Sequence, residues 1–226
     1  MGSITNNLQE VSRRITSACN AAGRRVDNVT LLAVSKTFGA DAVREAFAAG
    51  QRRFGENYVQ EALAKIDQLN DLRAQIEWHL IGPLQSNKTR LVAEHFDWVQ
   101  SVDSLKIAQR LSDQRPAALP PLQLCLQVNI SGQSSKSGLA PADVAALACA
   151  VAALPRLRLR GLMAIPEPGP DVAVAHRALC ELMRRLNQDL GLELDTLSTG
   201  MSADLEAAVA EGATLLRIGS AVFGAR

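Results

Sequence analysis

A lysine that follows a short apolar run near the start of the chain has the setting of a nucleophile. Residues 31–37 read Leu-Leu-Ala-Val-Ser-Lys-Thr, which is typical of a buried parallel strand. Because side chains alternate along a strand, Leu32, Val34 and Lys36 share one face. A lysine that ends a core strand is partly desolvated, so its amine loses a proton more easily and can form a Schiff base with an aldehyde. The alternative is a side chain that extends into solvent.

Residues 197–204, Leu-Ser-Thr-Gly-Met-Ser-Ala-Asp, have the features of an anion-binding loop. Gly200 permits a close approach of the backbone, and Ser202 is expected at the N-cap of a helix over 203–211. The N–H groups of the first helical turn would then point at a bound anion. The same residues also fit an ordinary helix cap, so this loop is weak evidence by itself.

Residues 217–224, Arg-Ile-Gly-Ser-Ala-Val-Phe-Gly, form the second such segment. Here Gly219 and Ser220 follow an expected strand that carries Arg217, although an ordinary turn would explain the glycine equally well. Phosphate often binds between the last two loops of a parallel α/β barrel. Together with Lys36, these loops predict a site for a phosphorylated aldehyde that is held at both ends, and pyridoxal 5′-phosphate fits that description.

The elements that must position these residues alternate between strand and helix along the chain. Strands are expected at 30–35, 53–56, 77–81, 97–101, 122–130, 157–163, 194–197 and 214–218. Helices are expected at 41–50, 57–69, 86–94, 103–113, 141–153, 171–189 and 203–211, and an amphipathic helix over 4–22 precedes the first strand. This order favours a closed (β/α)8 barrel over a doubly wound open sheet, as one domain over residues 1–226.

The segment 122–130 supports closure because its side chains alternate between leucine-rich and polar positions. One face would meet helices and the other a partly polar interior. Residues at strand ends would then gather at the C-terminal mouth, where barrel enzymes build their sites. The candidates are Lys36, Asn57, His79, Asn129 and Arg217. Each of them could also be a hydrogen-bonded polar group of the core.

The overall charge gives no reason to expect a polyanionic partner. Lys and Arg number 24 against 23 Asp and Glu, so no global field attracts nucleic acid or a membrane surface. The four cysteines are widely spaced and no signal peptide precedes them, which favours free thiols in the cytoplasm. No apolar run reaches the roughly 20 residues of a membrane span. The chain is expected to be soluble, cytoplasmic and monomeric.

Several longer motifs follow one another in order along the sequence. They are Ala-Val-Ser-Lys-Thr at 33–37, Phe-Gly-Glu-Asn-Tyr-Val-Gln-Glu at 54–61, Trp-His-Leu-Ile-Gly-Pro-Leu-Gln-Ser-Asn-Lys at 78–88, Val-Asn-Ile at 128–130, Ser-Lys-Ser-Gly at 135–138, Gly-Leu-Met-Ala-Ile at 161–165 and the two anion-binding segments. In these motifs the chain resembles, along essentially its whole length, the YggS/PROSC family of pyridoxal 5′-phosphate homeostasis proteins, which share the barrel of alanine racemase.

The resemblance implies a role for each candidate residue. It implies a Schiff base at Lys36, phosphate held by Ser202 and by the backbone of Gly219 and Ser220, Arg217 at the pyridine nitrogen and Asn57 near the ring. A guanidinium only donates hydrogen bonds, so Arg217 would keep the ring nitrogen unprotonated and weaken the ring as an electron sink. Lys136 is either a second, transient aldehyde site or a solvated loop lysine.

Three functions fit these residues. The first is a non-catalytic protein that stores pyridoxal 5′-phosphate or passes it to apoenzymes that depend on it. The second is a barrel-type amino-acid racemase, but racemases resembling alanine racemase use a tyrosine base and a second, β-rich domain. Tyr58 is the only tyrosine, and the sequence ends at Arg226, soon after the eighth expected strand. The third is an enzyme that uses Lys36 on a sugar aldehyde, as class I aldolases do. These features favour the carrier, with no metal.

Overall fold

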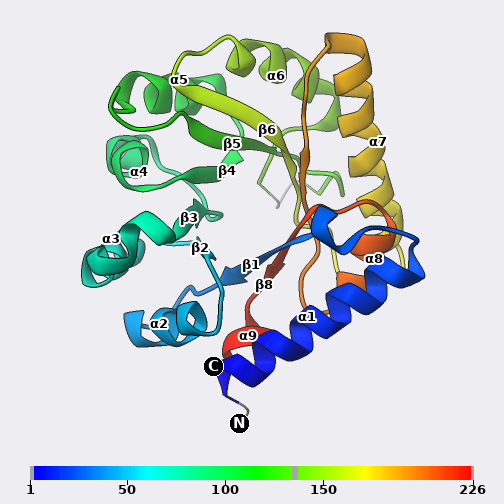
Figure 1. Ribbon diagram of the computed structural model, residues 1–226. Coiled ribbons are helices and arrows are strands. Elements are labelled where there is room, and N and C mark those ends of the chain that lie inside the picture. The colour runs from blue at the N-terminus through cyan, green and yellow to red at the C-terminus, as the bar shows by residue number, and fades with distance from the viewer. Residues whose placement is uncertain (1–2, 134–136, 225–226) are drawn as a thin grey trace.

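Eight parallel strands close into a barrel in chain order, with β8 pairing back to β1 (Figure 1). The structure is a computed structural model, which describes residues 3–133 and 137–224. The strands are β1 Thr30–Val34, β2 Arg53–Glu56, β3 Glu77–Leu80, β4 Trp98–Val102, β5 Leu122–Gln127, β6 Leu157–Met163, β7 Thr196–Ser198 and β8 Leu215–Ile218. The predicted (β/α)8 barrel is therefore confirmed.

The helices alternate with the strands along the chain and surround the barrel on its outside (Figure 1). They are α1 Ile4–Ala21, α2 Ala40–Ala48, α3 Val59–Gln68, α4 Thr89–His95, α5 Leu105–Gln114, α6 Val144–Ala152, α7 Val172–Leu190, α8 Leu205–Ala210 and α9 Ser220–Phe223, with short 3-10 turns at Val26–Asn28, Asn70–Gln75, Ser86–Lys88 and Pro141–Asp143. Within the described residues, no helix is both long and apolar enough to cross a bilayer.

Helix α1 is the predicted extra helix in front of the barrel. The Ser3 side chain caps its first turn by accepting from the N–H of Asn6. Its apolar face buries Leu8, Val11 and Ile15 in the main core. Figure 1 shows α1 running beside α8 and α9, so the first helix lies against the last elements described.

Several expected boundaries are wrong by one to three residues, among them those of β5, β7 and α8. Strand β5 ends at Gln127, the last residue that pairs in register with β6, and Val128 forms an isolated bridge with Leu139. Strand β7 begins at Thr196, two residues later than expected. Helix α8 begins at Leu205, with Asp204 at the N-cap position, so Ser202 is not the N-cap.

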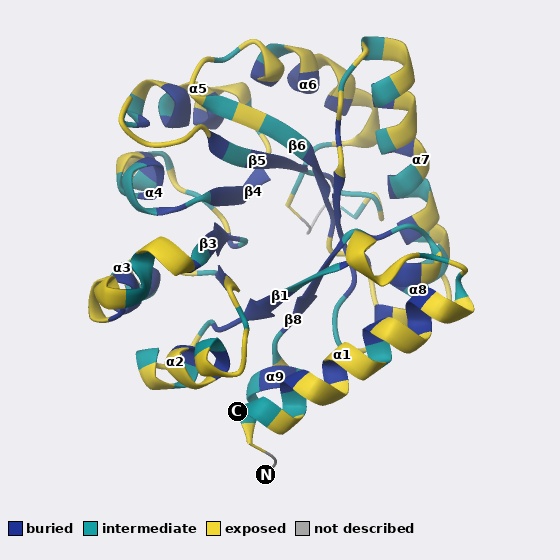
Figure 2. Cartoon of the chain, in the orientation of Figure 1, coloured by how far each residue is buried: buried dark blue, intermediate teal, exposed yellow. Residues whose placement is uncertain are grey.

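The buried side chains form two layers that the strand alternation predicts. The outer layer lies between strands and helices and includes Leu122, Leu124 and Leu126 of β5. Figure 2 shows the strands of the barrel mostly buried and the surrounding helices with exposed stretches. The inner layer fills the barrel and includes Cys125, which packs with Trp98 and Met163. Buried polar residues share this interior, namely His79, Gln100, Ser198 and Arg217. The barrel is thus a packed core with a polar component rather than a channel.

Candidate functional site

A cavity of about 410 Å³ opens at the carboxyl ends of the strands. Six residues that line it were predicted as a binding site from the sequence: Lys36, Asn57, Ser202, Arg217, Gly219 and Ser220. Apolar side chains complete the wall, namely Val34, Phe38, Ile81, Ile165 and Met201. The size lies within the range of small-molecule sites, and a few polar groups on an apolar wall are typical of such sites.

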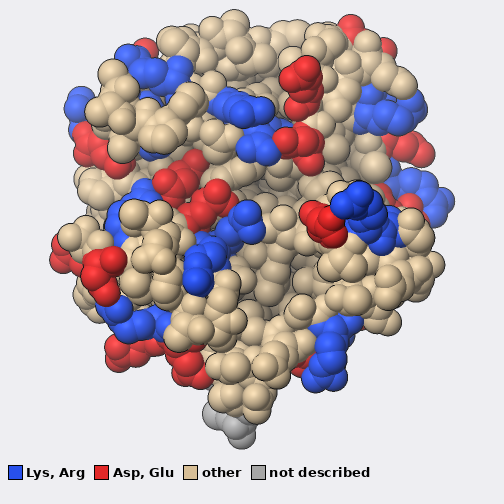
Figure 3. Space-filling model, in the orientation of Figure 1, with Lys and Arg blue, Asp and Glu red and all other residues tan. Residues whose placement is uncertain are grey.

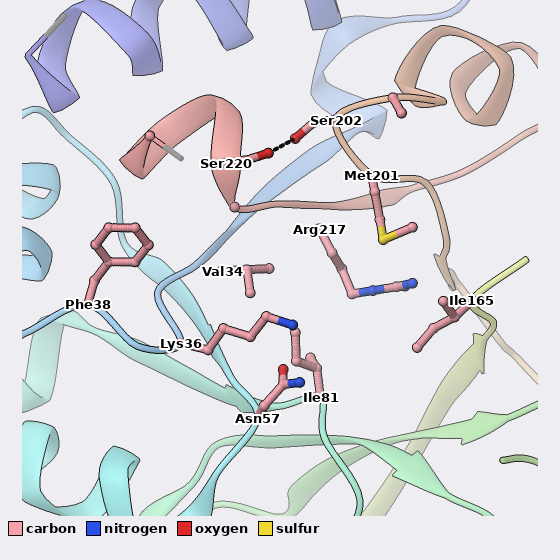
Figure 4. Close-up of a pocket in the computed structure, with 13 residues that line it drawn as sticks. Val34, Lys36, Phe38, Asn57, Ile81, Ile165, Met201, Ser202, Arg217 and Ser220 are labelled. Carbon is pink, nitrogen blue, oxygen red and sulfur yellow. Dashed lines mark hydrogen bonds between the residues drawn. The ribbon is translucent and has the colours of Figure 1, made fainter. Parts of the chain in front are cut away.

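Lys36 enters the cavity from the turn that follows β1. It is half-buried and stands two residues beyond the end of the strand. In Figure 4 its amine lies on the side of Asn57 and Ile81, with Val34 on the same wall. No hydrogen bond or ion pair with another described residue occupies this amine. An amine in this position is available to a ligand in the cavity.

The residue after Lys36 has a strained backbone. Thr37 has φ of 67°, a left-handed conformation that is rare for a β-branched residue. Its N–H donates to Glu61 Oε1 of helix α3 at 2.5 Å. Conformations of this kind persist only where the surroundings hold them, and they are frequent at functional sites. Glu61 thereby fixes the direction in which Lys36 leaves the strand.

A buried ion pair holds Ser35, the residue that precedes Lys36. Lys65 Nζ lies 2.6 Å from Glu56 Oε1 and donates to the Ser35 carbonyl at 2.9 Å, while Ser35 Oγ donates to the same Glu56 oxygen at 2.5 Å. Glu56 is fully buried and Lys65 is 4% exposed. Burial raises the pKa of Glu56, and the charge of Lys65 acts in the opposite direction.

Sequence reasoning missed this ion pair, although the sequence contained a signal for it. Lys65 occupies a position on the apolar face of α3, whose other buried members are Val59, Ala62 and Ile66. A charged residue on an apolar helix face needs a buried partner. Glu56, at the end of the preceding strand, is the carboxylate within reach.

Asn57 follows β2 and contributes a polar atom to the cavity wall. Its Oδ1 is buried and has no hydrogen-bond partner in the described structure. A side chain at position 82 would clash, because a Cβ on Gly82 would lie 2.2 Å from the carbonyl oxygen of Asn57. The neighbouring Tyr58 is 59% exposed and does not line the cavity.

Two hydroxyl groups meet at the opposite end of the cavity. Ser202 lies in the turn before α8, and Ser220 is the first residue of α9, after Gly219. Their oxygens are 3.4 Å apart, and Figure 4 marks this contact. The first N–H groups of a helix have no partner inside the helix. The loops after β7 and β8 therefore bring donor groups together, as the sequence predicts, although the helix N-cap adjoining Ser202 is Asp204.

Helix α1 forms hydrogen bonds to both the segment that carries Ser202 and the segment that carries Ser220. Arg14 donates to the carbonyl of Ser202 at 3.1 Å and pairs with Glu206 at 2.9 Å. Asn7 donates to the carbonyl of Val222 in α9 at 2.9 Å. The first helix thus fixes the spacing between the segments that carry Ser202 and Ser220.

Arg217 reaches the cavity from β8 and is 5% exposed. Its two terminal nitrogens donate to Ser198 Oγ and to the Ala164 carbonyl, each at 2.8 Å. Burial lowers the pKa of Arg217 to about 10, and Asp204 and Cys125 act in the opposite direction. The guanidinium therefore stays charged at neutral pH. Figure 4 shows it on the other side of the cavity from the Asn57 wall.

Two residues expected at the mouth do not line the cavity. His79 is fully buried inside the barrel and stacks on Trp98, with ring centroids 5.0 Å apart. It pairs in register with Trp98, the first residue of β4, and so lies below the mouth. Asn129 donates to the carbonyl of Gln133 and does not line the cavity. Lys136 lies outside the described residues.

The molecular surface carries both signs of charge without a dominant patch on the face shown. Figure 3 shows Lys and Arg interspersed with Asp and Glu around a hollow in that face. The near balance of 24 basic and 23 acidic residues agrees with this distribution. An anion is therefore attracted by local donors rather than by the field of the whole protein.

Comparison with known proteins gives consistent matches over the whole chain. The family model described as the alanine racemase N-terminal domain matches residues 6–226. The protein of Pseudomonas aeruginosa named pyridoxal phosphate homeostasis protein is 64% identical, with 100% of this chain and 97% of the relative covered. The protein of the same name from Escherichia coli K12 is 54% identical, with 100% and 98% covered. The solved structure of PipY from Synechococcus elongatus with PLP bound is 40% identical at a TM-score of 0.84, with 98% and 100% covered.

Proposed function

The chain belongs to the alanine racemase N-terminal domain family, and from this membership we propose that it binds pyridoxal 5′-phosphate, with Lys36 holding the cofactor as a Schiff base. The observation that carries the proposal is the composition of one cavity wall. An unpaired lysine amine, a buried guanidinium and two facing hydroxyls line the same 410 Å³ space. The names of the relatives and the PLP bound in the related PipY structure support it.

The residues present fit this cofactor. The buried Asn57 Oδ1 has no hydrogen-bond donor in the described structure, and the ring hydroxyl of pyridoxal 5′-phosphate is a donor. Ser202, Ser220 and the backbone after Gly219 would bind the phosphate, and Arg217 would donate to the ring nitrogen. The cofactor supplies an aldehyde that a lysine amine captures reversibly. Lys36 would hold it at one end and the two serine loops at the other.

We propose a carrier or buffer role in cofactor homeostasis, without substantial catalysis. Arg217 can donate to the ring nitrogen but cannot accept from a protonated one, so the nitrogen stays unprotonated. A ring in this state withdraws electrons poorly and suits storage of the cofactor more than carbanion chemistry. Delivery to PLP-dependent apoenzymes in the cytoplasm is part of the same proposal. The visible absorption spectrum before and after borohydride reduction tests cofactor binding directly.

Turnover of amino acids separates this proposal from a racemase. Tyr58 is exposed and lies off the cavity wall, so no tyrosine is placed there as a base. We expect racemisation, decarboxylation and transamination of common amino acids to stay far below about 1 s⁻¹, the lower end of ordinary enzyme rates. The measurement uses the cofactor-loaded protein and chiral product analysis, with an authentic alanine racemase as the positive control. Racemisation at or above that rate would refute the carrier role.

The phosphate loops are tested by comparing pyridoxal 5′-phosphate with pyridoxal. Ser202→Ala should weaken binding of the phosphate form by about 1 kcal/mol, since backbone donors remain. Gly219→Val should weaken it more, because even the Cβ would lie 3.3 Å from the Val34 carbonyl and the branched side chain needs further space. Pyridoxal affinity should change little in Ser202→Ala. Ser17→Ala, on the exposed face of α1, is the matched control. Equal affinity of the wild type for both ligands would exclude a phosphate site here.

A further inference from the structure

A line of polar side chains crosses the interior of the barrel behind Arg217. Arg217 donates to Ser198 Oγ at 2.8 Å, and Ser198 Oγ donates to Gln100 Oε1 at 2.6 Å. Gln100 Nε2 lies 2.8 Å from His79 Nδ1, and His79 Nε2 lies 2.9 Å from Glu77 Oε1. The three middle residues are completely buried and come from β7, β4 and β3. They connect the cavity wall to the start of β3.

The two ends of this line determine the direction of every hydrogen bond between them. A guanidinium only donates and a carboxylate only accepts. Ser198, Gln100 and His79 must therefore each accept a hydrogen bond from the neighbour nearer Arg217 and donate one to the neighbour nearer Glu77. For His79 this requires a neutral ring with its proton on Nε2, and burial lowers the pKa of His79, which favours the neutral ring. A protonated His79 would donate to Gln100 and force its amide to turn, so that both Gln100 and Arg217 would donate to Ser198.

Arg217 depends on this line for its orientation. Among the described residues, the hydrogen-bond partners of the Arg217 guanidinium are a hydroxyl and a carbonyl, and no carboxylate forms an ion pair with it. Its hydrogen bonds to side chains and backbone go to Ser198 and to the Ala164 carbonyl. Ser198 presents a lone pair to Arg217 as long as its hydroxyl hydrogen is directed at Gln100. The hydroxyl would otherwise be free to rotate, and the guanidinium would lose a fixed acceptor.

We propose that Ser198, Gln100 and His79 are positioning residues that hold Arg217 with an N–H directed at the ring nitrogen of the bound cofactor. The proposal rests on the proposed function, because it assigns the selectivity of the same site. The Arg217 guanidinium would recognise the ring nitrogen, and its direction would be set by the neutral side chains of Ser198, Gln100 and His79. A core that is merely filled would not distinguish a ring nitrogen from a ring carbon.

The test compares pyridoxal 5′-phosphate with its deaza analogue, in which a C–H group replaces the ring nitrogen. A hydrogen bond from a charged donor corresponds to roughly tenfold or more in affinity, so the wild type should prefer the natural cofactor by about that factor. Gln100→Met keeps the side-chain length and removes both hydrogen bonds. We expect its preference to fall severalfold, toward equal binding, while affinity for the analogue changes little. Gln123→Met, a glutamine of β5 outside this line, should keep the wild-type preference.

Ser198→Ala is the second variant and guards against misfolding of Gln100→Met. It removes the acceptor of Arg217 with the loss of one oxygen, and the preference for the ring nitrogen should fall as in Gln100→Met. A full preference in either folded variant would overturn the proposal. Equal loss of affinity for both ligands would also overturn it, since that result describes a packing role. A wild type that binds neither ligand would refute the proposed function itself.

Discussion

Replacing Lys36 by alanine is expected to abolish covalent capture of pyridoxal 5′-phosphate. Within the described residues, Lys36 is the lysine that lines the cavity, and its amine has no competing partner. The variant should show no visible absorption band from a Schiff base and no added mass after borohydride reduction. Noncovalent affinity should remain in part, because the serine loops and Arg217 are unchanged. The measurements are the absorption spectrum and peptide mass mapping after reduction.

Lys106→Ala provides the control, since Lys106 is exposed on α5 and does not line the cavity. That variant should retain the wild-type spectrum and the label on Lys36. A label of wild-type intensity in Lys36→Ala would contradict the assignment. If the label then mapped to Lys136, the second lysine site considered from the sequence would become the principal one.

Lys65→Met is expected to lower the free energy of unfolding by about 3–5 kcal/mol, the range found when a buried ion pair loses one partner. Glu56 is fully buried, and its second carboxylate oxygen already has no partner in the described structure. Removing Lys65 leaves the carboxylate without its counter-charge. Urea unfolding of wild type and variant at pH 7 measures the difference.

The loss in free energy of unfolding caused by Lys65→Met should grow as the pH rises. Burial raises the pKa of Glu56, and removing the opposing charge of Lys65 raises it further. The folded state then holds a proton that the unfolded state has lost, so stability falls between the unfolded and the folded pKa. Glu56→Gln/Lys65→Met should recover part of the stability and lose the pH dependence. A deficit independent of pH would show that Glu56 is not the cause.

The architecture was predictable because parallel strands that are buried on both faces appear as apolar runs between helical patterns. All eight strands were expected from this alternation, and the extra N-terminal helix was expected from its amphipathic pattern. Short elements such as α9 escaped prediction, because four residues carry too little periodicity. Boundaries shifted where a tertiary contact intervened, as where Val128 bridges Leu139 just after the end of β5.

The sequence predicted polar residues that line the cavity, but it did not predict how far along the barrel axis each residue lies. Alternation shows which face a residue occupies, and six predicted residues do line the cavity, while their roles toward a cofactor remain proposals. Height along the barrel depends on the stagger between strands, which no local pattern contains. His79 was misplaced for this reason. The line from Arg217 to Glu77 joins β8 to β3 across the interior, and such contacts are absent from single-sequence patterns.

The pairing of β8 with β1 has a consequence for the order in which the protein is made. About 180 residues separate Lys36 from Arg217, so at 5–20 residues per second the ribosome needs on the order of 10–40 s between them. During that interval β1 lacks its β8 partner and presents an open edge. A nascent chain therefore carries the lysine long before it has the arginine or the serine loops. If these residues bind the cofactor as proposed, its capture at full affinity must wait until β8 has been made and has paired with β1.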